Sequence, residues 1–273
     1  MIELPEAVVL SNQCNYWLKG RKVDFVVVNS KPHKFAWYID EGRHYQKLLE
    51  GKSFSYSTNI AGYLCLYFED VQAIFHDGVN LRFIETEAVH HNHQLLIRFT
   101  DHSQLIATVA MYGGLYVTEK GVIPTPYMNM SIENMNCLNP DFTYSYFISK
   151  ASDNMSIKAF LATQQRFPGI GNGVIQDVCF YAGLHPKTKI KDCSESELRH
   201  LYEKLVSTVR EMIALGGRDN EKDLMDHPGE YKVLMSNAQL KNPCTKCSGS
   251  ILKENYMGGS IYFCPRCQPM KKA

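Results

Sequence analysis

The sequence predicts an α+β fold with an N-terminal β-sandwich or barrel, a helical second part and a C-terminal four-cysteine β-hairpin. Short alternating or β-rich runs fill most of residues 23–118, whereas the pattern beyond residue 136 is helical. Four cysteines in two pairs follow between residues 241 and 273. A chain of 273 residues is longer than one compact core usually requires, so two domains are expected.

The composition excludes several classes of protein. With 45% hydrophobic and 21% charged residues, the chain is neither a disordered nor a coiled-coil sequence. No apolar run approaches the ~18 residues that a membrane helix needs, and carboxylates stand where a secretory signal would carry positive charge. We therefore expect a cytoplasmic protein. The net charge is +1, but residues 241–273 hold six basic residues and one acidic residue. This local excess of positive charge favours the binding of a polyanion to that segment.

The first residues predict a helix that ends near Gly20. Pro5 is favoured in a first turn, and Glu3 and Glu6 place negative charge at the positive end of the helix. An acidic residue at a helix start is often only a partner of the helix dipole, and this interpretation stays open for Glu3. Four apolar residues recur at helical spacing and predict one buried face: Ala7, Leu10, Cys14 and Leu18.

Six runs of β-forming residues follow the helix and are separated by short polar turns. Many short strands at this spacing predict a sandwich or a barrel. The expected strands cover residues 23–28, 54–57, 63–68, 72–75, 94–99 and 105–109.

Residues 119–135 contain glycine, proline and asparagine, are weakly periodic, and predict a linker. The chain before this linker, residues 1–118, is expected to form the β-rich domain together with the N-terminal helix. The chain after it, residues 136–240, is expected to be helical and to precede the cysteine-containing residues 241–273.

The helical part contains several start signals. Ser194 followed by Glu197 is a capping box, which predicts a long helix to about residue 215. Three other helices are expected. The first begins within residues 139–142, the second begins at Ser156, and the third spans residues 173–182.

The last four of the nine cysteines form the pairs Cys244/Cys247 and Cys264/Cys267. The sixteen residues between the pairs favour two strands joined by a glycine turn at 257–259. Such a hairpin brings four thiolates into a closed tetrahedral site, so we expect one structural Zn²⁺ ion. A fragment this short cannot bury a core of its own, and the metal would supply its folding free energy. The other cysteines are scattered in apolar or mixed surroundings, which predicts buried side chains.

A glycine-rich turn, Gly169-Ile-Gly171-Asn172-Gly173, lies between two predicted helices. It lacks the preceding strand and the third glycine of a dinucleotide-binding loop. A sharp helix–turn–helix connection of this kind brings backbone N–H groups and Asn172 against an anion such as a DNA phosphate. A plain helix connector is the alternative.

The sequence resembles the formamidopyrimidine-DNA glycosylase/endonuclease VIII family of base-excision repair enzymes, and the resemblance spans the whole chain. No single motif would suffice, but the motifs are specific jointly. They are the Glu-Leu-Pro-Glu start at 3–6, the glycine turn at 169–173, a helix-two-turns-helix continuation at 177–186, the glycine pair 216–217 and the hairpin ending Cys-Pro-Arg-Cys-Gln at 264–268.

The resemblance implies a β-sandwich domain, a helix-two-turns-helix domain and a zinc-finger β-hairpin. It also implies a monomer that holds damaged double-stranded DNA in the cleft between its domains. Members of the family flip a damaged base out of the duplex and cleave its glycosidic bond, because the reacting atoms are inaccessible inside the stack. The family's carboxylate chemistry falls on Glu3, supported by Glu6. Its phosphate contacts fall on Lys158 and Asn172, the latter flanked by Gly171 and Gly173.

The sequence departs from the family at the nucleophile, which is the amine of the second residue, usually proline, after removal of the initiator methionine. Here that residue is Ile2, whose bulky side chain normally prevents this removal, so we expect the amine on Met1. An α-amine has an intrinsic pKa of ~7.7–8.0, so Met1 can form a Schiff base. A displacement by one residue, about 3 Å, predicts inefficient strand cleavage.

Other family residues that face the DNA are also replaced. The family's strand lysine falls on Gly62, and the arginine at the tip of its zinc hairpin falls on Gly259. The methionine that fills the gap left by the flipped base falls on Val79. The segment with the intercalating arginine and phenylalanine contains Met111 and Tyr112 here, which are either replacement wedges or ordinary strand residues.

We therefore expect a DNA glycosylase with weak or no AP-lyase activity, associated with the nucleoid in a bacterial cell. The alternative is a non-catalytic protein that binds damaged or structured DNA and has lost the chemistry. A metal site built from histidines is a less favoured hypothesis than polar residues at strand edges. The histidines concerned are His76, His90, His91 and His93.

Overall fold

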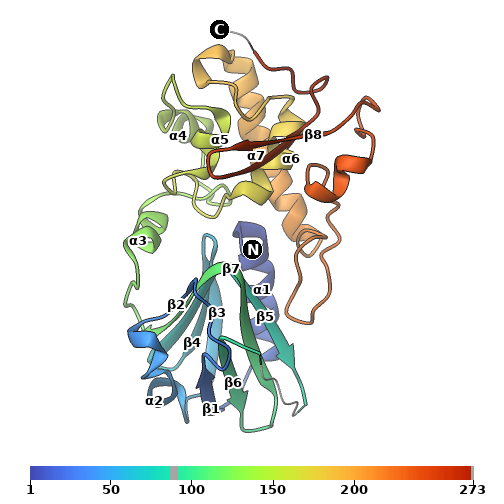
Figure 1. The fold of residues 1–273 in the computed structure, drawn as a ribbon. Helices are drawn as coiled ribbons and strands as arrows, with labels where there is room; N and C mark the ends of the chain where they lie inside the picture. Colours follow the sequence, from blue (N-terminus) through green and yellow to red (C-terminus); the bar gives the residue numbers. More distant parts are fainter. Residues whose placement is uncertain (87–91, 272–273) are drawn as a thin grey trace. The chain divides into compact units, whose positions relative to one another are not determined.

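The computed structural model describes residues 1–86 and 92–271, and its chain divides into two compact units (Figure 1). The first unit contains Met1–Asn129 and Leu215–Glu230, and the second contains Met130–Ala214 and Tyr231–Ala273. The division differs from the expected domain boundaries, because residues 215–230 join the β-rich unit instead of the helical one.

Leu224 explains why residues 215–230 belong to the first unit. Its side chain is 0% exposed and lies in the main core cluster of that unit. Its carbonyl oxygen accepts a hydrogen bond of 2.7 Å from Phe83 N–H, and its own N–H donates to Gln13 Oε1 at 2.9 Å. The surrounding sequence is mostly charged, so no local pattern predicted this insertion.

The first unit combines the N-terminal helix with a seven-stranded sheet, and the six predicted strands are confirmed. The strands β5 and β7 are much longer than expected, and the two-residue strand β2 was not predicted. The elements of the first unit are α1 (Leu4–Trp17), β1 (Val23–Val28), β2 (Ala36–Trp37), η1 (Asp40–Gly42), α2 (Tyr45–Leu49), β3 (Phe54–Ile60), β4 (Tyr63–Phe68), β5 (Val71–Ile84), β6 (Leu95–Phe99) and β7 (Gln104–Glu119).

The two long strands shape the sheet, whose order is β1-β6-β7-β5-β4-β3. A β-bulge between Asp77 and Val79 divides β5 into two halves, which pair with opposite halves of β7. At the bulge the strands approach so closely that a Cβ on Gly78 would lie 2.5 Å from Tyr112 O. The sheet therefore folds into two layers, as in a β-sandwich.

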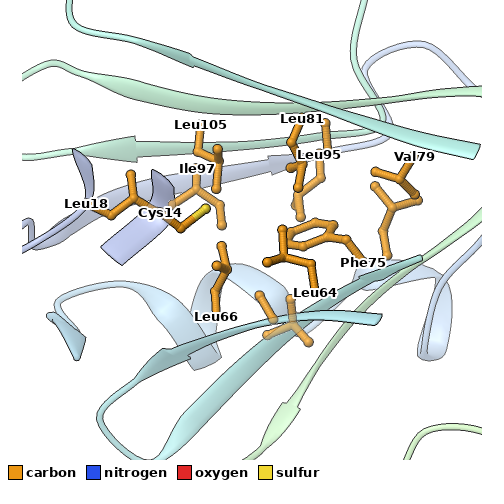
Figure 2. Packing of buried hydrophobic residues seen from close by; sticks show 14 of the residues in the cluster. Cys14, Leu18, Leu64, Leu66, Phe75, Val79, Leu81, Leu95, Ile97 and Leu105 are labelled. Carbon is orange, nitrogen blue, oxygen red and sulfur yellow. The ribbon is translucent and has the colours of Figure 1, made fainter. Parts of the chain in front are cut away.

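The core of the first unit lies between these layers. Figure 2 shows Leu64, Leu66 and Phe75 from one half of the sheet facing Leu81, Leu95, Ile97 and Leu105 from the other half. Cys14 and Leu18 lie in the same core, and with Ala7 and Leu10 they form the buried helix face that the sequence predicted.

The second unit is helical and ends in the β-hairpin. The predicted starts at Ser156 and Ser194 are confirmed, because each side chain caps its helix, but the first helix begins later than expected, after the cap Thr143. Residues 119–135 are not a plain linker, since they contain α3. The elements are α3 (Pro126–Glu133), at the boundary of the units, α4 (Tyr144–Ser149), α5 (Ile157–Ala162), α6 (Asn172–Ala182), η2 (Ile190–Asp192), α7 (Glu195–Ala214), η3 (Asn237–Lys241), β8 (Leu252–Tyr256) and β9 (Gly259–Phe263).

The helices of the second unit pack around aromatic side chains, and Asp177 ties the chain after Tyr231 to them. The ring cluster contains Phe142, Phe147, Phe160, Phe167 and Tyr202. Asp177 is fully buried and accepts hydrogen bonds from Tyr231 Oη at 3.0 Å and from Met235 N–H at 2.8 Å. In the described part of the chain, the helices are too short or too polar to cross a membrane.

Candidate functional site

The start of α1 gathers two buried carboxylates. Glu3 is the residue before the first helical turn and Glu6 lies within that turn, and the two form a capping box in which Glu3 N–H donates to Glu6 Oε2 at 3.2 Å. Their side chains are only 4% and 5% exposed. Capping alone does not require both carboxylates to be buried, and buried carboxylates need a counter-charge.

Arg218 supplies this counter-charge. Its guanidinium donates to both carboxylate oxygens of Glu6, from Nε at 2.8 Å and from Nη2 at 2.7 Å, and its Nη1 lies 3.5 Å from Glu3 Oε1. Arg218 is 1% exposed, and Nη2 also reaches the carbonyl oxygen of Met1 at 3.4 Å. One planar guanidinium therefore orders the N-terminus and both carboxylates.

The pKa values of Glu6 and Arg218 follow from their burial and from the charges around them. Burial by itself would raise the pKa of Glu6, but the charge and hydrogen bonds of Arg218 outweigh it and leave that pKa lowered. Burial would likewise lower the pKa of Arg218, but Glu6 and Glu3 raise it well above its ordinary value. Both groups are therefore charged at neutral pH.

The chain terminus lies in the same cluster. The α-amine of Met1 donates to and forms an ion pair with Glu221 Oε2. Burial raises the pKa of Glu221, and the opposing charges of the amine and Arg218 do not fully cancel this effect. Ile2 is 5% exposed and its N–H donates to Asp77 O at 2.5 Å in a β-bridge, which fixes the terminus to β5.

Neither Arg218 nor Glu221 was predicted from the sequence. The only local signal was the glycine pair that precedes them, which has positive φ angles of 68° and 100° at Gly216 and Gly217. Such a pair marks a turn, but no spacing rule connects residues that are more than 200 positions apart in the chain.

An aromatic cluster lies beside this terminus on the same unit. His76 is paired through Nδ1 with Asp77 at 3.0 Å, and its ring lies among those of Trp37, Tyr63 and Tyr116. The expectation of a polar residue at a strand edge is therefore wrong for His76, which is 6% exposed. Trp37, which was not singled out, is 42% exposed.

Tyr112 and Met111 differ in their surroundings. Tyr112 is half-buried and contacts Trp37. Burial raises the pKa of Tyr112, and the nearby carboxylates of Asp77 and Glu3 add to this rise, which places the phenol close to the N-terminal cluster. Met111 is 65% exposed on β7.

Val79 does not lie on an accessible surface. Its side chain is 1% exposed and belongs to the core of the first unit, where Figure 2 labels it beside Phe75. The prediction that Val79 contacts DNA is therefore wrong: after the bulge, the inward-facing positions of β5 continue with this residue. Gly62, at the position of the family's lysine, lies in the turn between β3 and β4.

In the second unit, Lys158 and Asn172 lie together at the tip of the hairpin. Lys158 Nζ donates to Tyr256 O at 2.7 Å, and Asn172 Nδ2 donates to Ser260 O at 3.1 Å. A Cβ on Gly259 would lie 3.5 Å from Lys158 Nζ and 3.8 Å from Asn172 Cγ. The two predicted phosphate contacts are thus neighbours of each other and of Gly259, the position of the family's hairpin arginine.

Both side chains retain the capacity to bind an anion. An ammonium group has three N–H donors and an amide has two, so one bond to the hairpin does not exhaust either group. Lys158 is 5% exposed, and burial lowers its pKa. An anion beside it would favour the charged form. Gly171 and Gly173 flank Asn172 at the first turn of α6, with Gly171 as the cap in an extended conformation.

Gln176, one turn further along α6, fastens the hairpin to this helix. Its Nε2 donates to Ser260 O at 3.0 Å and its Oε1 accepts from Tyr262 N–H at 3.0 Å. This residue was not predicted from the sequence, since a glutamine in a helix gives no signal of a long-range backbone partner.

The four C-terminal cysteines form a group suited to a metal ion. Their sulfur atoms all lie within 4.8 Å of one another, with 3.8 Å between Cys244 and Cys267 and 3.4 Å between Cys247 and Cys264. Tetrahedral thiolates around zinc at 2.3 Å would be about 3.8 Å apart, so the donor set fits this ion. The hairpin turn at Met257 and Gly258, with φ of 51° and 72°, confirms the predicted hairpin.

Histidines do not form a second group of this kind in the described ranges 1–86 and 92–271, where the four cysteines are the group identified. His90 and His91 lie outside the described residues. His93 is buried near Ser30 in the first unit.

Comparisons with known proteins agree with this architecture. The family described as the formamidopyrimidine-DNA glycosylase H2TH domain matches residues 134–222. A formamidopyrimidine-DNA glycosylase from Bacillus cereus is 24% identical over 280 aligned positions, which cover 98% of this chain and 99% of the relative. One from Listeria innocua is 25% identical and covers 98% of this chain and 100% of the relative.

Solved structures show the same fold. Lactococcus lactis Fpg in complex with DNA that contains an abasic site is 20% identical, with a TM-score of 0.82 over 98% of this chain and 99% of that chain. The same enzyme in complex with DNA that contains Fapy-dG gives a TM-score of 0.82 over 98% and 100%. These matches show that the chain is similar to formamidopyrimidine-DNA glycosylases over nearly its whole length, that residues 134–222 match the H2TH domain of that family, and that the whole chain has the fold of Lactococcus lactis Fpg.

Proposed function

We propose that this chain is a DNA glycosylase of base-excision repair, which removes a damaged base that has been flipped out of the duplex. The observation that carries this proposal is the N-terminal cluster, in which an α-amine and three carboxylates surround one buried arginine. Buried charges are costly, and an amine beside carboxylates supplies a nucleophile and proton-transfer groups. The substrate class agrees with the lesion-containing DNA bound by Lactococcus lactis Fpg. In a bacterial cell such an enzyme would act in the cytoplasm, at the nucleoid.

The groups of the cluster have separate tasks in this reaction. The lone pair of the Met1 amine attacks C1′ of the deoxyribose, and the glycosidic C–N bond breaks. Its electron pair leaves with the base, which takes up a proton. Glu3 passes a proton to the ring oxygen as the sugar opens, and the product is a Schiff base on Met1. Attack by water instead of the amine would release the base without a covalent intermediate.

Borohydride trapping on DNA with an abasic site tests the proposal together with base release from a library of damaged oligonucleotides. A trapped adduct on the N-terminal peptide, with base release, is the expected result. Base release without an adduct would assign the attack to water. If neither occurs, the chain is a DNA-binding protein without the chemistry and the proposal is wrong.

The intact mass of the purified protein identifies the nucleophile. We expect Met1 to be retained, because Ile2 is bulky and its N–H is engaged by Asp77 O. Because the amine of Met1 is displaced by one residue from the family's nucleophile, we expect strand cleavage to be slow compared with base release. A mass lower by one methionine would transfer the role to Ile2 and remove the reason for slow cleavage.

We propose that Lys158 and Asn172 hold a DNA phosphate beside the hairpin tip, with the N–H groups of the first turn of α6, around Gly171 and Gly173, as further donors. Met111 and Tyr112 remain candidates for contacts with the unpaired bases. The phosphate contact concerns the backbone and not the bases, so it contributes to affinity for every sequence.

Replacing Asn172 with alanine is expected to weaken binding to all DNA sequences alike. Lys158→Gln should also lower the salt dependence of binding by about one phosphate contact. Fluorescence anisotropy at several salt concentrations, on intact and lesioned duplexes, measures both effects. Asn139→Ala, which changes an exposed asparagine of the same unit, serves as the control. A loss confined to one sequence or one lesion would contradict a phosphate contact.

We propose that the four-cysteine group holds one structural Zn²⁺ ion, which would stabilise the hairpin without taking part in the chemistry. Cys264→Ser is expected to abolish stoichiometric zinc in elemental analysis. The same change should lower the affinity for DNA, because Lys158 and Asn172 rest on the hairpin. Cys193→Ser, at a half-buried cysteine outside the group, should retain the metal. Zinc-free wild-type protein with full DNA affinity would contradict a structural role.

A further inference from the structure

Glu221 lies on a segment that is fastened to the first unit on both sides. Before it, Arg218 is bonded to Glu6 and to the Met1 carbonyl. After it, Leu224 is buried in the core and bonded to Gln13 and Phe83. The carboxylate of Glu221 is therefore held against the α-amine by contacts that do not involve the amine itself.

The charges around Glu221 leave the amine as its nearest partner. Glu6 occupies Nε and Nη2 of Arg218, and the distance from Nη2 to Glu221 Oε1 is 4.0 Å. The other oxygen, Oε2, is paired with the Met1 amine. The charged groups that face Glu221 in the described part of the chain are thus this amine, Arg218 and the like-charged Glu6. Its neighbour Lys222 is bonded to Asp226 instead, at 2.8 Å.

We propose that Glu221 is a positioning residue that holds the α-amine of Met1 and accepts its proton before the amine attacks the sugar. This inference rests on the proposed glycosylase function and assigns to the cluster a residue distant in sequence from the N-terminal helix. The nucleophile of the family is the amine of the second residue, whereas here it is the amine of Met1. Glu221, on segment 215–230 of this chain, would hold that displaced amine in place.

On an abasic site, the protons move between the Met1 amine, Glu221 and the departing oxygen. Met1–NH3⁺ gives one proton to the Glu221 carboxylate, and the nitrogen lone pair then bonds to the C1′ aldehyde carbon. The aldehyde oxygen leaves as water with two protons that come from the nitrogen, one of them returned by Glu221. An ammonium and an aldehyde thus become an iminium and water, with no change in total charge. Borohydride adds hydride to the iminium carbon in the trapping experiment.

This arrangement has a distinctive pH dependence. Glu221 Oε2 is paired directly with the Met1 amine, and burial raises the pKa of Glu221, which makes this carboxylate a stronger proton acceptor than an exposed one. The proton can therefore pass from the amine to Glu221 within the pair and not to solvent, so the reaction depends less on the pH of the solution. Without Glu221 the ammonium must give its proton to solvent, and the neutral fraction of an ordinary α-amine falls about ten-fold per pH unit below its intrinsic pKa of ~8.

The test compares wild type, Glu221→Gln, Glu221→Asp and Glu50→Gln, all as full-length protein. Glu50 is an exposed carboxylate of the same unit, so its change to glutamine is a matched control. The first readout is the rate of borohydride-trapped adduct on abasic-site DNA from pH 6 to 9. The second is the rate at which an amine-selective succinimidyl ester labels the N-terminal peptide over the same range, measured by mass spectrometry without DNA.

For wild type and Glu50→Gln, both rates are expected to change little with pH. For Glu221→Gln, both rates should fall about ten-fold per pH unit below pH 8 and recover at pH 9. Glu221→Asp should restore the shallow profile at a lower rate. Equal profiles for wild type and Glu221→Gln, or faster reaction of Glu221→Gln at every pH, would overturn the inference. Labelling that depends on Glu221 without any adduct or base release in wild type would support the inference and reject the glycosylase.

Discussion

Glutamine in place of Glu3 is expected to lower the rate of base release by about 10²- to 10⁴-fold, the range that general acid–base catalysis contributes. Glutamine has the same size but cannot pass a proton to the opening sugar. The fold should persist, because Arg218 keeps its two short bonds to Glu6 and its contact with Glu3 is longer, at 3.5 Å. Single-turnover release of the base measures the effect.

Two further measurements separate catalysis from stability at Glu3. Affinity for DNA and the melting temperature of Glu3→Gln should both stay close to wild type. The matched variant Glu41→Gln, at an exposed carboxylate of the first unit, should retain base release. Unchanged base release with a lower melting temperature would mean that Glu3 only caps α1 and interacts with the helix dipole.

Replacing Arg218 with methionine is expected to destabilise the protein by about 3–5 kcal/mol, the usual cost of removing one partner of a buried ion pair. Methionine fills much of the space, but the carboxylates of Glu3 and Glu6 then stay buried without their counter-charge. Denaturant unfolding at pH 7.5 measures the loss. Arg43→Met, at an arginine that is 70% exposed with a partner that is equally accessible, should change little.

The stability of the Arg218→Met variant should change with pH in the opposite direction to that of wild type. In wild type the pKa of folded Glu6 is lowered, so its contribution is present above the unfolded value near 4.5 and is lost as the pH falls below it. Without Arg218, burial raises that pKa, so the penalty is full at neutral pH and shrinks as the pH falls towards 4.5. The variant should therefore approach wild-type stability at pH 5.

The double variant with Glu6→Gln provides the check on this explanation. Removal of the unpaired charge should recover part of the lost stability at pH 7.5, because the remaining amide tolerates burial better than a carboxylate does. If the double variant is as unstable as Arg218→Met at every pH, lost packing and not charge explains the effect.

Local patterns predicted the local elements of the fold. The buried face of α1 and the limits of β1 and β4 agree with the structure, because each depends only on near neighbours in sequence. The sequence around Gly78 resembles a turn, but it is a bulge within the continuous strand β5, so this strand was cut short. Pro126 suggested a linker, whereas it begins α3, where proline is well tolerated.

The functional site was predictable only where a motif is contiguous. Spacing alone identified the four cysteines, and the resemblance pointed to Glu3, Lys158 and Asn172. Arg218 and Glu221 reach the N-terminus across more than 200 residues, and their charged neighbours resemble an ordinary solvated loop. Val79 shows the opposite error, since correspondence with a family position does not reveal that a bulge turns a side chain into the core.

The insertion of Leu224 into the first unit has a consequence for how the protein is made. The chain leaves this unit after Asn129 and returns only at Leu215, so a growing polypeptide on the ribosome cannot complete its N-terminal half when that half emerges. The amine of Met1 can meet its ionic partner Glu221 only after the intervening helical segment has been synthesised. The N-terminal cluster is thus complete only after residues 130–214 have been synthesised and residues 215–230 have returned to the first unit.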